Sequence, residues 1–139
     1  MNKIYVPDQT TEISLPLYMT SIEAGFPSPA DDYIEGSLDL NEHLIKHPAA
    51  TFFVRVSGES MIKAGIFPGD ILIVDRSLEA VDKKIVIAVV DGELTVKRLR
   101  IRSGKPSLEP ENDRFAPIEI KPDMSFEIWG VVTNVIHKV

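Results

Sequence analysis

A serine in a glycine-bounded turn and a lysine on a strand are the residues best suited to chemistry. Ser60 lies in VSGESMIKAG, residues 56–65, directly after a β-branched and aromatic run. Gly58 allows a sharp bend, and residues 61–64 can form one helical turn that ends at Gly65. A hydroxyl at this place lies beside unpaired backbone N–H groups, which can stabilise a tetrahedral oxyanion. Taken alone, the segment is more simply interpreted as a serine N-cap.

Lys97 is the charged residue on an otherwise uncharged face of a predicted strand. In LTVKRL, residues 94–99, side chains alternate, so Thr95, Lys97 and Leu99 share one face while Arg98 lies on the other. Burial against apolar neighbours lowers the pKa of an ammonium group and makes a neutral amine available as a base. The alternative is a lysine that extends its charge into solvent.

Together these two residues are the best candidates for a nucleophile and its base. A serine hydroxyl is a poor nucleophile until a base removes its proton. Few other bases exist, because His43 and His47 lie on a short predicted helix and His137 lies near the carboxyl terminus, where a Ser-His-Asp triad has no place for them. The HLIKH segment also lacks the glutamate of a zinc-binding HExxH helix. We therefore expect surface histidines, no metal site and no cofactor.

The other charged motifs have structural interpretations. Asp70 and Asp75 flank the apolar run in PGDILIVD, residues 68–75, and we expect them to accept hydrogen bonds from backbone N–H groups. A locally basic stretch is most simply a solvated strand edge that discourages aggregation, with a contact to a protein partner as the alternative. This stretch contains Lys97, Arg98, Arg100, Arg102 and Lys105.

The order of the elements predicts a mainly β protein with one short helix. Frequent prolines and glycines in residues 1–37 break every longer pattern, which predicts an extended N-terminal arm. Asp39 followed by Glu42 resembles a helix start, and Pro48 ends that element. Runs of β-branched and aromatic residues then predict strands at 51–56, 71–75, 84–90, 93–101, 117–120 and 126–136.

We expect residues 38–139 to form one compact domain whose strands pair mostly antiparallel. The Asp91-Gly92 pair between two strands favours a type I′ hairpin, which needs positive φ at both positions. No long helical period separates the strands, so a parallel βαβ sheet is disfavoured. With 139 residues, 44% of them hydrophobic and 26% charged, the chain has the length and composition of one folded domain with an arm.

Charge and composition exclude several classes of protein. A net charge of -6 opposes attraction to phosphates or anionic membranes, so direct DNA binding is not expected. Without cysteine there is no disulfide framework, thiolate zinc site or cysteine nucleophile. The longest stretches free of charge, residues 13–22 and 128–137, fall well short of the roughly 20 residues of a membrane span. Asp8 and Glu12 stand where a secretory signal would be apolar. We expect a cytoplasmic protein.

Three blocks of the sequence resemble the peptidase domain shared by LexA-type repressors and the UmuD family of SOS mutagenesis proteins. They are VSGESM (56–61), PGDILIVD (68–75) and GELTVKRL (92–99), preceded by AGFPSPA at 24–30. The resemblance covers roughly residues 15–139. It implies a compact, mostly antiparallel LexA/signal-peptidase-like β domain.

The resemblance implies a serine endopeptidase that acts on its own chain. By match to the family motifs, Ser60 is the nucleophile and Lys97 its general base. We expect the backbone N–H groups of Glu59 and Ser60 to receive the oxyanion. The scissile bond falls at Ala24–Gly25, where alanine is the LexA-like choice before the glycine.

The residues around that bond suit cleavage on physical grounds. Ala24 and Gly25 are small, and Pro27 and Pro29 discourage a helix, so an extended backbone can approach a nucleophile closely. The chain between Gly25 and Ser60 reaches on the order of 100 Å when extended, enough to enter its own site or a partner's. Cleavage would leave residues 25–139.

The UmuD resemblance further implies a role in the SOS response. It suggests a homodimer whose self-cleavage is stimulated by the RecA nucleoprotein filament, and whose shortened form joins a UmuC-type Y-family polymerase for error-prone translesion synthesis. A complete DNA-binding repressor is disfavoured because only about fifty residues precede the first core strand, too few for a second domain. The alternatives are a catalytically silent dimeric adaptor, a phage- or plasmid-type repressor peptidase domain, and a signal-peptidase-like protease acting on other proteins.

Overall fold

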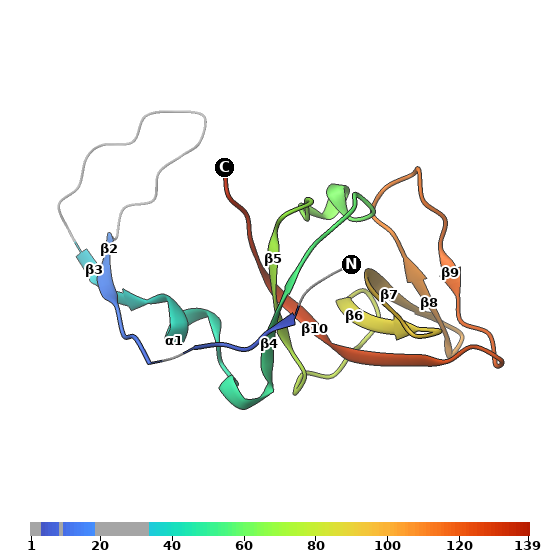
Figure 1. Cartoon of the computed structure of the whole chain (residues 1–139), viewed down its shortest axis with the longest axis horizontal. Coiled ribbons are helices and arrows are strands. Elements are labelled where there is room, and N and C mark those ends of the chain that lie inside the picture. Colours follow the sequence, from blue (N-terminus) through green and yellow to red (C-terminus); the bar gives the residue numbers. More distant parts are fainter. Residues whose placement is uncertain (1–3, 9, 19–33) are drawn as a thin grey trace. The chain divides into compact units, whose positions relative to one another are not determined.

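The computed structural model describes residues 4–8, 10–18 and 34–139 (Figure 1). Contacts within the chain define two compact units. The larger consists of Met1–Pro7 with His47–Val139, and the smaller of Asp8–Lys46. The division into an arm of residues 1–37 and a domain of residues 38–139 stays a prediction.

The larger unit is built on one eight-stranded sheet in the order β1-β4-β5-β10-β6-β7-β8-β9. Every neighbouring pair is antiparallel. The mainly β, antiparallel fold expected from the sequence is thereby confirmed. The strands are β1 (Ile4–Tyr5), β4 (Thr51–Arg55), β5 (Ile71–Asp75), β6 (Ile85–Val90), β7 (Glu93–Arg102), β8 (Lys105–Glu109), β9 (Ile118–Glu119) and β10 (Phe126–Ile136).

Two tight hairpins connect β6, β7 and β8. Asp91 and Gly92 have φ angles of 48° and 82°, as predicted for a two-residue turn. The sequence did not predict β8, whose KPSLE segment lacks a β-branched or aromatic run. It pairs with β7 because Ser103 and Gly104, with φ angles of 52° and 73°, form a second turn of the same kind.

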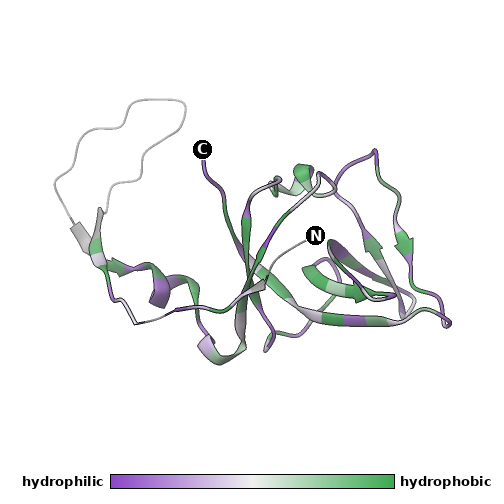
Figure 2. Ribbon diagram, in the orientation of Figure 1, coloured by the Kyte–Doolittle hydropathy of each residue, from purple (hydrophilic) through white to green (hydrophobic). Residues whose placement is uncertain are grey.

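Two apolar clusters form the core of the larger unit. Val96 of β7 belongs to one cluster, and Leu99 of the same strand belongs to the other. Met61, the residue after Ser60, is buried in the first cluster. Figure 2 shows the hydrophobic residues distributed along these strands. The strand that carries Lys97 and the turn that carries Ser60 are therefore both attached to the core.

The smaller unit contains a two-stranded antiparallel sheet and the predicted helix. β2 (Ser14–Tyr18) pairs with β3 (Ile34–Asp39), and α1 (Leu40–Leu44) follows directly. Asp39 caps the helix, as predicted, by accepting a bond from the Asn41 N–H at 3.0 Å. The sequence predicted an extended arm here and located no strand in it. Both strands run through expected breaks, since β2 contains Pro16 and β3 contains Gly36, and Pro16 is tolerated because β2 has a free edge in a two-stranded sheet.

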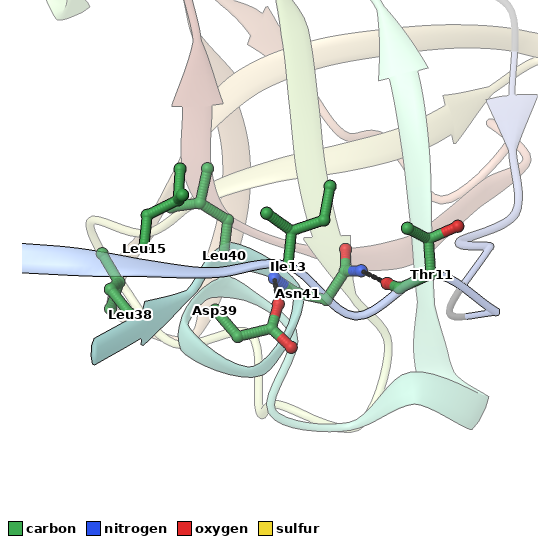
Figure 3. A pocket seen from close by; sticks show the side chains of 7 residues that line it. All are labelled: Thr11, Ile13, Leu15, Leu38, Asp39, Leu40 and Asn41. Atoms are coloured by element: carbon green, nitrogen blue, oxygen red, sulfur yellow. Dashed lines mark hydrogen bonds between the residues drawn. The ribbon is translucent and has the colours of Figure 1, made fainter.

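A hollow of about 430 Å³ lies within this smaller unit (Figure 3). Its apolar side chains include Ile13, Leu15 and Leu40, each more than half exposed. Its lining includes neither member of the predicted Ser-Lys pair. In the ranges that the structure describes, none of the helices is long and apolar enough to cross a bilayer.

Candidate active site

Ser60 and Lys97 lie in contact in the larger unit. The distance from Lys97 Nζ to Ser60 Oγ is 3.0 Å, although 37 positions separate the residues in the sequence. The same Nζ lies 2.8 Å from Thr95 Oγ1 and 3.1 Å from the Val96 carbonyl oxygen. Within the described residues, the lysine nitrogen thus has three oxygen partners, and all three are uncharged.

The turn that carries Ser60 is closed at its base by backbone hydrogen bonds. The Val56 N–H donates to the Asp70 carbonyl at 2.8 Å, and the Gly69 N–H donates to the Val56 carbonyl at 2.9 Å. A short helix follows Ser60 at Ile62–Ala64 and ends at Gly65, whose φ is 79°. The predicted helical turn is confirmed in 3-10 form. Ser60 therefore has a fixed backbone at the start of this turn.

Burial lowers the pKa of the Lys97 ammonium group below its usual range. Desolvation causes this shift, because removing the amine from water penalises its charged form. Among the residues that the structure describes, no carboxylate lies within ion-pair distance of Nζ. The charged form consequently has no counter-ion to stabilise it, which favours the neutral amine that a general base requires.

The three oxygen partners of Nζ suit either protonation state, because an ammonium group can donate to all three. A neutral amine has two N–H donors and one lone pair, whereas a carbonyl oxygen can only accept. The two N–H groups can therefore bond to the Val96 carbonyl and Thr95 Oγ1, which leaves the lone pair for the Ser60 hydroxyl proton. The sequence placed Thr95 on the face of Lys97 without assigning it to the site. Its position two residues earlier on the strand was the available signal.

The basic stretch of β7 is not the solvated edge that the sequence suggested. β7 lies between β6 and β8 in the sheet. Arg98 pairs with Glu111, and Arg100 Nε lies 3.1 Å from Asp82 Oδ1. Both arginine side chains are less than one-third exposed. The expected sheet edge was wrong because β8, which was not predicted, pairs with β7, but Arg102 and Lys105 are exposed.

Asp70 and Asp75 each accept a backbone N–H, as predicted. Each also holds a histidine that the sequence left unpartnered. His137 Nδ1 lies 2.6 Å from Asp70 Oδ1, and His47 Nδ1 lies 2.5 Å from Asp75 Oδ2. Both histidines are about half exposed, so they are surface residues in specific pairs. These partners lie too far apart in the sequence for a local pattern to show them. His43 on α1 is exposed.

The predicted scissile bond, Ala24–Gly25, lies outside the residues that the structure describes. The use of the Glu59 and Ser60 N–H groups as oxyanion donors stays a prediction. Their carbonyl oxygens accept hydrogen bonds from Asn112 and Glu111 respectively. Within the described part of the chain, no group of three or more His, Asp and Glu side chains is placed to hold a metal ion.

Comparison with known proteins gives one family. The model of the peptidase S24-like family matches residues 16–133. ImpA of Salmonella typhimurium is 52% identical over 123 residues, which are 88% of this chain and 83% of the relative. MucA of Escherichia coli is 51% identical over 122 residues, 87% and 83% of the two chains. SamA of Salmonella typhimurium strain LT2 is 43% identical over 136 residues, 97% and 94% of the two chains. Both the matched range and these identities show that the chain belongs to the S24-like serine peptidases, within the UmuD family of SOS mutagenesis proteins.

Proposed function

We propose that this protein cleaves its own chain between Ala24 and Gly25, with Ser60 as nucleophile and Lys97 as general base. The observation that carries the proposal is the 3.0 Å contact between Lys97 Nζ and Ser60 Oγ. Its chemical support is the lowered pKa of a lysine that is buried among uncharged partners. A positioned base beside a serine is the arrangement that nucleophilic catalysis requires.

In the proposed reaction, neutral Lys97 accepts the Ser60 proton while Oγ attacks the Ala24 carbonyl carbon. The N–H groups of Glu59 and Ser60 stabilise the oxyanion of the tetrahedral intermediate. When the intermediate collapses, the peptide bond breaks and the Lys97 ammonium returns its proton to the Gly25 amine. Lys97 then removes a proton from water as the water oxygen attacks the ester carbonyl carbon, and it passes that proton to Ser60 Oγ when the C–O bond breaks. This step releases the Ala24 carboxyl group and regenerates neutral Lys97 and the Ser60 hydroxyl.

The UmuD family supports a regulatory role for this cleavage. Loss of residues 1–24 leaves the 25–139 form as the active, homodimeric subunit of an error-prone translesion polymerase in the cytoplasm. The RecA filament on single-stranded DNA promotes cleavage, and a UmuC-type Y-family polymerase is the partner of the shortened form. Direct DNA binding by this chain is not part of the proposal, because its net charge is -6.

The test is incubation of the purified full chain from pH 7 to pH 10, followed by mass spectrometry. We expect a fragment that begins at Gly25, produced faster as pH rises because more Lys97 is neutral. Ser60→Ala and Lys97→Ala should give none. Cleavage by either variant at the parent's rate would exclude the Ser-Lys assignment. An intact parent, both after alkaline incubation and after addition of RecA filament, would instead favour the silent adaptor.

A further inference from the structure

The loop that follows β8, residues 110–115, contacts the backbone around the proposed nucleophile. The Glu111 N–H donates to the Ser60 carbonyl at 2.8 Å, and the Glu111 carbonyl accepts from the Lys63 N–H at 2.9 Å. The Glu111 side chain pairs with Arg98, the residue after Lys97 on β7. One residue of this loop is therefore bonded both to the turn of the nucleophile and to the strand of the base.

Asn112, the next residue of the 110–115 loop, is buried and uses both ends of its side-chain amide. Its exposed fraction is 7%. Nδ2 donates to the Glu59 carbonyl oxygen at 2.8 Å, and Oδ1 accepts from the Arg114 N–H at 3.1 Å. The bond from Arg114 fixes the direction of the amide, because Oδ1 can accept and Nδ2 can only donate. The donor is consequently held toward Glu59.

We propose that Asn112 is a positioning residue for the oxyanion site, acting through the peptide between Glu59 and Ser60. This inference rests on the proposed self-cleavage. The described peptide bonds include no cis bond, so the Glu59 carbonyl and the Ser60 N–H lie on opposite sides of one planar unit. A bond that fixes the carbonyl therefore also fixes the direction of the N–H, which is a proposed oxyanion donor.

Asn112 supplies the short hydrogen bond to this carbonyl. Glu59 O also accepts from the Ile62 N–H, but at 3.4 Å, a distance beyond the usual range for such bonds. Hydrogen bonds in a chain polarise one another, so donation to the carbonyl strengthens the N–H at the other end of the peptide as a donor. Without Asn112, the Glu59 carbonyl would keep the 3.4 Å bond alone among those from described residues, and the peptide would tilt more freely. The transition state would then lose stabilisation that the ground state does not need.

The first test compares self-cleavage by Asn112→Asp and Lys63→Gln with the parent. Asn112→Asp keeps the shape and the acceptor for Arg114 but removes the donor to Glu59. Lys63→Gln makes the same change in net charge at a nearby exposed residue whose ion pair is with Asp113. Loss of an oxyanion donor costs about 10²- to 10³-fold, so misplacing one should slow cleavage by at least about tenfold. Lys63→Gln should stay within about twofold of the parent.

The pH profile separates positioning from an effect on the base. Asn112→Leu removes the donor without adding charge, and it should lower the cleavage rate over the whole range from pH 7 to pH 10. The pH at which the rate rises should not move, because Lys97 keeps its surroundings. Melting temperatures should show that all variants are folded at the assay temperature. Parent-like cleavage by both Asn112 variants would overturn the proposal.

A second measurement does not depend on cleavage. In a Ser60→Ala background, the Glu59 carbonyl ¹³C and residue 60 amide ¹⁵N resonances report the hydrogen bond to this peptide. Asn112→Asp should shift both, whereas Lys63→Gln should leave them in place. If the parent does not cleave, the proposed function fails while this measurement still decides whether Asn112 holds the peptide. Unchanged resonances in Asn112→Asp would overturn the positioning role even if the parent cleaves.

Discussion

Lys97 and Arg98 are neighbours on β7, but the two side chains lie on opposite faces of the strand and have different partners. Lys97 Nζ has only uncharged oxygen partners among the residues that the structure describes, and burial lowers its pKa. Arg98 is paired with the Glu111 carboxylate and also donates to the Lys83 carbonyl at 2.6 Å. Alternation along a strand separates the two environments by one residue.

The difference shows which surroundings favour loss of the proton from a cation on a strand. Both side chains are partly buried, so burial alone does not distinguish them. A carboxylate stabilises the charged form and gives a structural ion pair, whereas uncharged acceptors leave the cost of desolvation uncompensated. The identity of the residue completes the distinction, since a guanidinium keeps its proton and an amine can lose it.

The largest expected effect comes from placing a guanidinium on the Lys97 face. Lys97→Arg keeps a positive charge near Ser60 but cannot accept a proton. We expect self-cleavage at pH 9 to fall by about 10²- to 10⁴-fold, the usual contribution of a general base. Arg98→Lys exchanges the same two residue types on the other face and should retain most of the activity. Efficient cleavage by Lys97→Arg would show that Ser60 is activated in another way.

A carboxylate placed beside Lys97 should stabilise its charged form, as Glu111 does for Arg98 on the other face of β7. Thr95 Oγ1 lies 2.8 Å from Nζ, so Thr95→Asp would supply a counter-ion and raise the pKa of Lys97. Each unit by which the pKa rises lowers the neutral fraction about tenfold at neutral pH. We expect the curve of cleavage rate against pH to move to higher pH, with slower cleavage at pH 7. Thr95→Asn is the uncharged control and should leave the position of the curve nearly unchanged.

The sequence predicted the two faces of β7 better than it predicted what covers them. Alternation and the Asp91-Gly92 turn located Lys97 on a mostly uncharged face, and the resemblance to the peptidase family linked it to Ser60. The carboxylate at Glu111 could not be predicted, because β8 and the loop after it lack a strong strand pattern. The contact made by Asn112 was not predicted either, for a related reason. Its partner Glu59 lies 53 positions away, and no local rule relates an amide to a carbonyl at that distance.

Replacing the cation by methionine should change the free energy of unfolding in opposite directions on the two faces of β7. The folded state holds Lys97 at a lowered pKa, so its charged form destabilises the fold at neutral pH, and stability recovers as pH rises toward the pKa of the unfolded chain. Lys97→Met should therefore raise the free energy of unfolding at pH 7, by no more than about 1 kcal/mol because the group is partly solvated. Arg98→Met should lower it by about 1 to 2 kcal/mol, since Glu111 loses its partner.

Urea unfolding at pH 7 and pH 10 measures both differences. The gain from Lys97→Met should shrink at the higher pH, because the parent lysine is then increasingly neutral in the folded state. The loss from Arg98→Met should persist, since the guanidinium stays charged at both values. Destabilisation by Lys97→Met equal to that of Arg98→Met would mean that both cations are structural.

An effect smaller than that of Arg98→Met is expected at Ser77, whose hydroxyl is bonded to a carboxylate, whereas the Thr95 hydroxyl lies beside an amine. Burial acts to raise the pKa of Asp75, but hydrogen bonds from Ser77 and His47 outweigh it and lower the pKa. Ser77 Oγ donates to Asp75 Oδ1 at 2.6 Å.

Ser77→Ala should reduce the free energy of unfolding at pH 7 by about 0.5 to 1.5 kcal/mol, whereas Ser77→Thr keeps the hydroxyl and most of the stability. The contribution is present above the unfolded pKa of Asp75 and is lost as pH falls through the lower folded value. Thermal melts from pH 7 downward should therefore show Ser77→Ala and the parent converging in acid, and a constant difference would mean that the hydroxyl stabilises the fold independently of the charge on Asp75.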